Sequence, residues 1–552
     1  MRTSRNSTGL LILPGLFFLA VTFVVPVVGV LLRSFDPDGR LSFVAPRFSL
    51  TNYSELLGSP IYSIIFQNTF LIAVIATVVT LILAYPMCYF LSRLSRPWAG
   101  ALIILALFPF WTSILARLFA FTQILPQFGL MYTTTATIIG MVYYLLPYMI
   151  AILYANMAGI DNEVMNAART LGASLTQALR RVFIPMTKSG VFVGATVVFV
   201  ISLGFFLTPA VLGGGSDLTV ATYIQQQVDI ASWGTASAIG TVLLVLTLAV
   251  FFGSSRFFGS DELVVVGVGS QKGVARTEKL RFTWPIVVGF ISTIIIFVFL
   301  LLPLIVVILL SFASTSYLSF PPTGFSWQWY GRFFSDADWL ASAWLSLQVA
   351  LLTAVSATLL GLITAIALER GGIPAKKFIM ALFLAPLIVP AILTAVALFD
   401  LSNRLHLSGT IVGYVVGHTL LALPITVMII STALSTTGTE LEQAARTLGA
   451  SRHRAFTMVT ARMIAPSLGV AAIFAFVTSW DEPVVALFMS TGRTTLPVHI
   501  FNHMRTEVTP TIAAVSTVLM ALVLFGTLAA YGISYAVRRR RLETGSQEST
   551  GG

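Results

Sequence analysis

The chain has 552 residues, of which 57% are hydrophobic and only 10% are charged. Soluble proteins carry about a quarter of their residues as Asp, Glu, Lys or Arg, so this composition excludes a soluble globular protein and indicates a chain that lies mostly in lipid. The one cysteine, Cys88, excludes an intrachain disulfide and a cysteine-based metal site. The net charge of +11 suits either nucleic-acid binding or membrane topology, and the positions of the charges decide which.

Apolar runs long enough to cross a membrane recur along the whole chain. A hydrocarbon core about 30 Å thick needs about 20 apolar residues in a helix. The runs predict an all-α polytopic membrane protein with twelve spans, six in each half. Their predicted bounds are Leu10 to Leu32, Ile64 to Leu91, Ala99 to Ala120, Thr135 to Met157, Val191 to Leu212, Ala236 to Phe252, Trp284 to Leu310, Ala343 to Leu368, Phe378 to Phe399, Gly409 to Ala433, Met463 to Leu487, and Ile512 to Val537. The first run is too long for a secretory signal core and no A-x-A site follows it, which predicts an uncleaved anchor.

Basic residues are unevenly distributed between the segments that connect these spans. If the N-terminus is cytoplasmic, most of the 32 Lys and Arg residues fall in cytoplasmic segments, among them Arg93, Arg96, Lys376, Lys377 and the run 538–541. This is the pattern of the positive-inside rule. It predicts that both termini are cytoplasmic and explains the net charge by membrane topology, so the expected surroundings are membrane lipid and no nucleic-acid partner is expected.

The chain contains an internal repeat with an offset of 277 residues. The string AARTLGAS stands at Ala167–Ser174 and again at Ala444–Ser451, and the same offset relates Arg93 to Arg370 and Pro109 to Pro386. An even number of spans per copy gives both copies the same orientation, so a parallel repeat of two six-helix units is expected. The predicted domains are a first unit at 1–258, a cytoplasmic linker at 259–282, a second unit at 283–541 and a disordered tail at 542–552.

The longest identical block lies in a predicted cytoplasmic loop, where solvation by lipid imposes no sequence. Val164, Ala168 and Leu171 follow the i, i+4, i+7 spacing of one helix face, and Gly172 is placed to end this helix in a left-handed cap. The second copy repeats the pattern with Leu441, Ala445, Leu448 and Gly449, and a second, basic helix is predicted after each glycine, with Arg180 and Arg181 or Arg452 and Arg454.

Such a short amphipathic helix has two plausible environments. It could lie in a groove of another protein, or rest on anionic headgroups near the flanking arginines. The two near-identical copies, with Ala-Ala where a membrane-surface helix favours Leu or Phe, favour a protein groove.

The pattern E-x-x-x-A-A-x-x-x-G in both loops resembles the EAA loop in the membrane subunits of binding-protein-dependent ABC importers. The resemblance implies a permease of the bacterial inner membrane that works with two copies of a cytoplasmic ABC ATPase and an extracytoplasmic substrate-binding protein. It implies that one ATPase contacts Glu163, Ala167, Ala168 and Gly172, and the other contacts Glu440, Ala444, Ala445 and Gly449. One departure concerns the proline that the family places thirteen residues after the glycine. Pro185 fits, but Arg462 stands at the matching position, and Pro466 is expected to end that helix instead.

Further segments narrow the resemblance toward spermidine/putrescine importers. Pro109–Ser113 and Met131–Pro147 resemble the first permease of those systems, while Ser479–Pro483 and Thr495–Pro497 resemble the second. Ferric-iron importers share the loop and also use fused permeases of this size, so iron or another small solute is the alternative cargo.

The chain lacks the features of an enzyme. It contains no GxxxxGK[ST] motif, so ATP must be hydrolysed by a separate subunit. The histidines lack ligand spacing, and no metal or cofactor is expected. His418 lies alone in an apolar helix and is expected to be a hydrogen-bonded core residue.

An ion-coupled secondary transporter is the competing class, because such carriers also contain parallel repeats of six helices. They need ionisable residues at mid-membrane to bind protons or sodium. Here Arg117, Asp400, Asp481 and Glu482 are expected near the outer ends of the spans. Their positions and the duplicated loop favour coupling to ATP.

Two adjacent acids are candidates for the substrate path. Asp481 and Glu482 follow Trp480, and the matching positions in the first copy are Gly204 and Phe205, so the acids break the internal symmetry. A carboxylate pair beside an indole could attract a polyamine by charge and by cation–π contact. The alternative is that these residues form only a hydrated loop end.

Overall fold

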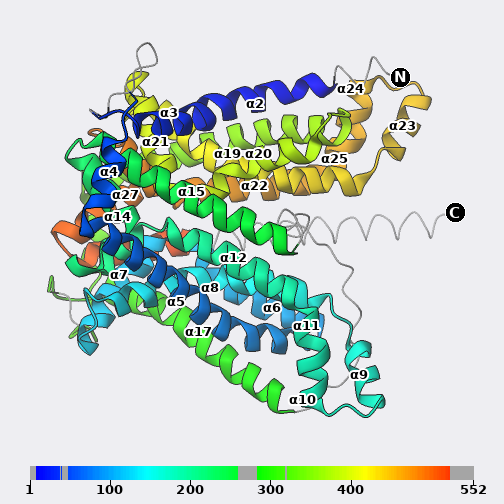
Figure 1. Ribbon diagram of the computed structural model, residues 1–552, viewed down its shortest axis with the longest axis horizontal. Helices are drawn as coiled ribbons and strands as arrows, with labels where there is room; N and C mark the ends of the chain where they lie inside the picture. Colours follow the sequence, from blue (N-terminus) through cyan, green and yellow to red (C-terminus); the bar gives the residue numbers. More distant parts are fainter. Residues whose placement is uncertain (1–7, 38, 40–47, 259–282, 318–319, 523–552) are drawn as a thin grey trace.

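The computed structural model describes residues 8–37, 39, 48–258, 283–317 and 320–522 (Figure 1). Within these ranges the secondary structure is helical apart from an isolated bridge between Ala313 and Phe325. The predicted linker 259–282, the tail and the part of the twelfth span after Leu522 lie outside the described residues.

The described residues contain eight helices long and apolar enough to cross a membrane. They are Leu10–Arg33 (with α2, Leu13–Leu19, and α3, Val25–Arg33), α5 (Pro60–Leu91), α8 (Thr134–Ala158), Trp233–Ser254 in α15 (Trp233–Phe258), α17 (Trp284–Ser311), α19 (Ala337–Arg370), α22 (Ile411–Thr437), and Arg452–Trp480 (with α24, Arg452–Ala455, and α25, Ala461–Trp480). Together with three bent pairs and the final helix at Pro510–Leu522, they account for all twelve predicted spans up to Leu522. The prediction of an all-α membrane protein is confirmed.

Two predicted spans, Ala99 to Ala120 and Phe378 to Phe399, are broken rather than straight, and a third bend lies just before the predicted span Val191 to Leu212. The bent pairs are α6 (Arg96–Leu107) with α7 (Ile114–Ile124) at 89°, α10 (Leu175–Ala178) and α11 (Ile184–Met186) with α12 (Lys188–Leu203) at 57°, and α20 (Lys376–Ile388) with α21 (Ala391–Arg404) at 96°. The break before α21 follows from Pro390, because a proline holds the preceding residue, Val389, in an extended conformation (ψ 132°). Thr112 (ψ 146°) and Ser113 (ψ 131°) are also extended before α7, although no proline follows them.

The predicted spans Val191 to Leu212 and Met463 to Leu487 extend beyond the C-terminal ends of the observed helices. α12 ends at Leu203 and α25 at Trp480, and each is followed by a separate short helix, α13 (Leu207–Leu212) and α26 (Val484–Met489). The other short helices are α4 (Thr51–Gly58), α9 (Asn162–Thr170), α14 (Val220–Asp229), α18 (Gln328–Ser335), α23 (Glu440–Thr447) and α27 (Leu496–Thr506). At the first break Gly204, Phe205 and Phe206 give no polar signal, whereas Asp481, Glu482 and Pro483 mark the second break in the sequence.

The repeat seen in the sequence is also a repeat of helices. α5 begins at Pro60 and α19 at Ala337, and α8 begins at Thr134 and α22 at Ile411, each at the predicted offset. The first helix of each half, however, packs on the opposite half. The segment α2–α3 lies against α19 and α21, while α17 lies along α5 and α7 (Figure 1). Two polar contacts hold α17 to the first half, because Tyr143 donates to the carbonyl oxygen of Leu300 (2.8 Å) and Ser292 donates to that of Leu83 (2.7 Å).

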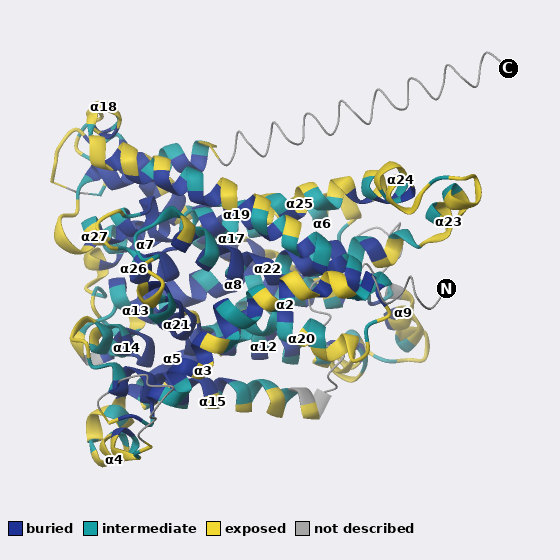
Figure 2. Cartoon of the chain, turned by 90° about the horizontal axis from the view of Figure 1, so that it is seen from above, coloured by how far each residue is buried: buried dark blue, intermediate teal, exposed yellow. Residues whose placement is uncertain are grey.

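The two halves pack closely at one end and diverge toward the other. The close end carries α4, α14 and α27, and the ribbons spread toward α9 and α10 in one half and α23 and α24 in the other (Figure 1). We call the end with α9 and α23 the loop end and the opposite end the closed end. Seen from above, exposed residues gather at both ends of the bundle, on α4 and α18 at the closed end and on α9, α23 and α24 at the loop end, while buried residues fill the middle (Figure 2).

A buried ion pair joins the halves near the closed end. Arg33 of α3 is 5% exposed and donates to Asp400 of α21 at 2.5 Å, and its guanidinium lies 5.1 Å from the ring centroid of Trp233. Trp233 stacks in turn on Phe399 at 5.6 Å. Asp400 also accepts from Arg404 at 3.0 Å. These contacts fix the exchanged first helix of one half to the other half.

Candidate functional site

The first loop helix, α9, has defined signals at both ends. Its N-cap is Asp161, whose side chain accepts from the N–H of Glu163 at 3.0 Å. At the other end Gly172 has φ +90°, and its N–H bonds to the Arg169 carbonyl (3.0 Å) while the N–H of Ala173 bonds to that of Ala168 (3.1 Å). This is the Schellman motif, which favours glycine because its left-handed residue is strained with any Cβ. The predicted helix and its cap are confirmed.

The second loop helix, α23, ends in the same geometry. Gly449 has φ +90°, and the equivalent hydrogen bonds run from Gly449 to Arg446 (3.1 Å) and from Ala450 to Ala445 (3.0 Å). Ser174 and Ser451 then cap the following helices, which carry the predicted arginines and include a π-helical turn in both copies. The geometry of the loop is therefore duplicated along with its sequence.

The exit from the two loops differs, as the substitution at Arg462 indicated. In the first copy, Pro185 lies next to the 57° bend that precedes α12, whereas in the second copy the helix runs without a break from Arg452 to Trp480. The expectation that Pro466 ends the helix is wrong, because Pro466 lies inside α25. Proline in a helix removes one hydrogen bond and can kink the helix without ending it.

The loop helices present an apolar surface to solvent. Leu171 and Leu448 are each 89% exposed, and they stand just before the two capping glycines. Of the residues expected to contact the ATPase, six are exposed, namely Glu163, Ala167, Gly172, Glu440, Ala444 and Gly449, while Ala168 and Ala445 are half-buried. Two exposed leucines therefore stand in equivalent positions of the two copies, at the loop end of the bundle.

A half-buried arginine contacts the loop region in each half. In the second copy Arg370 pairs with Glu442 of α23, which also accepts from Thr460 at 2.6 Å. In the first copy the equivalent Arg93 lies over the rings of Tyr89 (5.1 Å) and Phe183 (4.9 Å). These two arginines are separated by the repeat offset of 277 residues, a signal in the sequence that could have predicted their equivalent roles.

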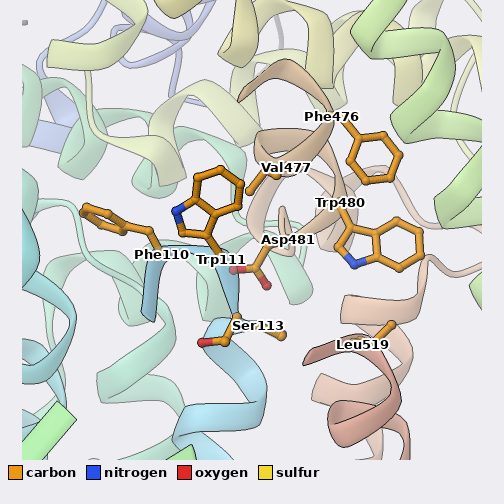
Figure 3. Close-up of a pocket in the computed structure, with 9 residues that line it drawn as sticks. Phe110, Trp111, Ser113, Phe476, Val477, Trp480, Asp481 and Leu519 are labelled. Carbon is orange, nitrogen blue, oxygen red and sulfur yellow. The ribbon is translucent and has the colours of Figure 1, made fainter. Parts of the chain in front are cut away.

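A pocket lies where the two halves meet, and it contains two of the three residues predicted for the substrate path. Its lining is Phe110, Trp111, Thr112 and Ser113 from the break before α7, Phe476, Val477, Trp480 and Asp481 from the end of α25, and Leu519. Figure 3 shows Trp111 and Trp480 on either side of the Asp481 carboxylate. The break that the sequence did not predict thus forms one wall of this pocket.

Asp481 binds the start of α7 across the interface between the halves. Its two carboxylate oxygens accept from the N–H of Ile114, both at 3.1 Å, and Arg117 lies 4.0 Å away. A carboxylate at a helix N-terminus is stabilised by the free N–H groups and by the helix dipole. Asp481 is therefore a contact between the halves in this conformation.

Glu482 has different surroundings from its neighbour. Its carboxylate accepts from the N–H groups of Val484 (2.9 Å), Val485 (3.0 Å) and Ala486 (3.1 Å) at the start of α26. It is 9% exposed and lies outside the pocket lining, so it is not part of a hydrated loop end. Nearby, His418 is 1% exposed with its Nδ1 atom 2.7 Å from Ser479 Oγ, which confirms the expected hydrogen-bonded core histidine.

The internal repeat gives a second, equivalent interface between the halves, where the end of α12 meets the start of α21. This other interface has no acid at the position of Asp481. Gly204 replaces Asp481 there and faces Pro390, which replaces Ser113. A Cβ on Gly204 would lie 2.6 Å from Pro390 Cβ and 2.9 Å from its Cα. The fold therefore accepts a tight apolar contact at this position and does not itself require an acid.

We expect Gly204→Ala to destabilise the chain by about 1–3 kcal/mol, because the added methyl group forces Pro390 and the start of α21 to move. Thermal unfolding of the purified chain measures this effect. Gly469→Ala in α25 is the matched control, since its Cβ would meet nothing within 4 Å and alanine favours the helix. Equal melting temperatures for the two variants would contradict the tight contact.

The duplicated bundle of apolar helices and its paired loop helices are the features of a membrane-embedded transport component. A family model described as "Binding-protein-dependent transport system inner membrane component" matches residues 10–259 and 357–542, and the chain belongs to that family. It is a multi-pass inner-membrane permease, and membership implies an ATPase and a substrate-binding protein as partners.

Several curated relatives resemble the chain over nearly their whole length. The spermidine/putrescine transport system permease protein PotB of Escherichia coli (strain K12) is 32% identical over 260 residues, which is 43% of this chain and 94% of the relative. PotB of Haemophilus influenzae is 31% identical over 266 residues, 44% of this chain and 88% of the relative. The putrescine transport system permease protein PotI of E. coli (strain K12) is 30% identical over 270 residues, 47% of this chain and 94% of the relative.

Proposed function

We propose that the chain forms the complete translocation path of an ATP-driven importer for polyamines such as spermidine and putrescine. Two residue ranges match the permease family, and the similar proteins named above transport polyamines according to their descriptions. The two units joined by the linker 259–282 then do the work of two separate permease subunits.

The duplicated loop helix carries this proposal. We propose that α9 and α23 each dock in one copy of a cytoplasmic ABC ATPase, through the predicted glutamate, alanine and glycine residues and through Leu171 and Leu448. Their identical caps and equal exposure support docking to two identical partners. The chain itself would hydrolyse no ATP.

Movement of the halves follows from this arrangement. ATP-driven closure of the two ATPases would draw α9 and α23 together, and the halves, which diverge at the loop end, would rock about their contacts (Figure 1). The closed end would then open toward a loaded binding protein. This requires the contact between Asp481 and the start of α7 to break.

The same reasoning sets the orientation in the membrane. The loop end would be cytoplasmic, because it carries the docking helices and the arginines Arg180, Arg181, Arg452 and Arg454. Arg452 also binds Thr8, which places the start of the described chain at this end. Both termini are accordingly proposed to be cytoplasmic.

We propose that Trp480 and Asp481 face the substrate path and that Glu482 supports them by holding the start of α26. Its three backbone hydrogen bonds fix the turn between α25 and α26 that carries Asp481. Ferric ion as the cargo has less support, because a hard cation is held by about six or more oxygen ligands and the pocket offers one carboxylate.

ATP hydrolysis stimulated by cargo tests the function. The chain is reconstituted in liposomes with its ATPase and binding protein, and hydrolysis is measured with spermidine, putrescine or ferric ion. Stimulation by the polyamines is expected. Stimulation by ferric ion alone would overturn the cargo, and uptake that needs no ATP but collapses with the proton gradient would overturn the class.

A further inference from the structure

The pocket between the halves has the composition of a site for an organic cation. Four aromatic rings line it, from Phe110, Trp111, Phe476 and Trp480, together with the carboxylate of Asp481. Phe476 and Trp480 stack on each other, with ring centroids 5.7 Å apart and 14° between their planes. Ring faces attract ammonium groups and also cover methylene groups, while the carboxylate supplies the opposite charge.

The internal repeat supplies a comparison within the same molecule. At the equivalent positions of the other interface, Leu387, Ile388 and Leu203 replace Phe110, Trp111 and Trp480, and Gly204 replaces Asp481; only Phe199 matches an aromatic residue, Phe476. The halves meet there through the Gly204–Pro390 contact. The aromatic rings and the acid are therefore confined to one of two equivalent places, and packing of the fold does not account for them.

Asp481 already has a cation beside it, but that cation is poorly bound. Arg117 is 3% exposed, and its Nη2 atom is 4.0 Å from Asp481, beyond hydrogen-bonding distance. Its Nε donates to the Ser113 carbonyl at 3.2 Å, its guanidinium lies 5.7 Å from the Tyr143 ring centroid, and Nη1 has no hydrogen-bond partner among the described residues. A compact primary ammonium in the pocket could approach the carboxylate more closely than this guanidinium does.

We propose that this pocket is a binding site for one protonated primary amine of the cargo, with Asp481 as its counterion, Trp111 and Trp480 as its walls, and Arg117 as the cation that neutralises Asp481 when the site is empty. The inference rests on the proposed function for its cargo. It also links binding of the amine to opening of the closed end. An ammonium that pairs with Asp481 would replace its hydrogen bond to the start of α7, which is one of the contacts between the halves.

Removing the charge of Asp481 and removing the charge of Arg117 should have opposite effects on the affinity for the amine. Without the Asp481 carboxylate, the amine loses its counterion. Without the Arg117 charge, the amine loses its competitor and binds more tightly. A purely structural ion pair would behave differently, because removal of either partner would damage the same interface and lower binding in both cases.

The test measures binding of radiolabelled spermidine to the purified complex of the full chain with its ATPase, without the binding protein. Asp481→Asn should weaken binding at least about tenfold, Trp111→Ala and Trp480→Ala several-fold, and Arg117→Gln should strengthen it several-fold. Ile388→Ala and Leu203→Ala, at the equivalent positions of the other interface, should leave binding within about twofold.

The possible outcomes distinguish failure of the proposed binding site from failure of the proposed function. Retention of wild-type binding by Asp481→Asn, or a loss of similar size in Arg117→Gln, would overturn the site. Melting temperatures of all variants identify any that fail to fold, and Asp481→Glu, which keeps the charge, should keep part of the binding. If the wild-type complex binds spermidine in the pocket but imports none in liposomes, the proposed function fails and the site remains.

Discussion

Replacing Leu171 and Leu448 together with aspartate is expected to abolish ATP-driven uptake while the chain folds normally. Both side chains are 89% exposed in the isolated chain, so the substitutions should change its free energy of unfolding by less than about 0.5 kcal/mol. When the ATPases dock, the same positions would bury an unpaired carboxylate in each interface, and affinity should fall at least about tenfold at each. Co-purification of the ATPase and uptake in liposomes measure the two effects.

The chain offers a matched control at its other end. Leu57 of α4 is 85% exposed and lies at the closed end, away from α9 and α23 (Figure 1). Leu57→Asp should leave ATPase co-purification unchanged. The single variants Leu171→Asp and Leu448→Asp should each lose one of the two ATPases. Full retention of the ATPase by the double variant would contradict docking through these helices.

Asp400→Ala is expected to destabilise the chain by about 3–5 kcal/mol, because it leaves a buried arginine without a counterion. The side chain of Arg33 is 6% exposed and its charge-assisted hydrogen bond to Asp400 measures 2.5 Å. Thermal unfolding in detergent should show a fall in melting temperature of several degrees.

Two further variants separate the buried pair from its exposed neighbour. Arg404 also pairs with Asp400, but its side chain is 45% exposed, so Arg404→Ala should cost no more than about 1 kcal/mol. Arg33→Met combined with Asp400→Leu removes both charges and should recover much of the stability lost in Asp400→Ala. If Asp400→Ala and Arg404→Ala cost the same, the buried pair does not hold the exchanged helix.

The loop helices could be predicted because their signals are local. The spacing of Val164, Ala168 and Leu171 sets the helix face, and a glycine at position 172 or 449 stops the helix, with both signals within about ten residues. The repeat reinforced them, since the same pattern stands at equivalent positions of both copies. The structure added the exposure of the two leucines, which depends on how the whole bundle folds.

The pocket could be predicted only in part, because its walls come from residues far apart in the chain. Trp480 and Asp481 were recognisable as breaks in the internal symmetry. Trp111 and Phe110 required knowledge that the span splits at Thr112 and turns toward the other half. An apolar segment containing a proline fits a straight, kinked or broken helix equally well, and tertiary packing selects among these.

Asp481 and Glu482 show the same limit at the scale of a single residue. They are adjacent acids, and the sequence treats them alike. In the structure Asp481 bridges the two halves, while Glu482 binds three N–H groups of its own half. The turn after α25 decides which of the two carboxylates lines the pocket. The direction of this turn cannot be predicted from the local sequence.

The exchange of first helices has a consequence for biosynthesis. Arg33 meets Asp400 only after 367 further residues have been made, which takes about 20 to 70 s at ordinary ribosomal speed. During that time Arg33 lacks its carboxylate partner, and its guanidinium must stay near the aqueous headgroup layer. Assembly therefore cannot proceed strictly from the N-terminal to the C-terminal unit, and a ribosome that stalls before α21 would leave an incomplete product for the quality-control proteases of the membrane.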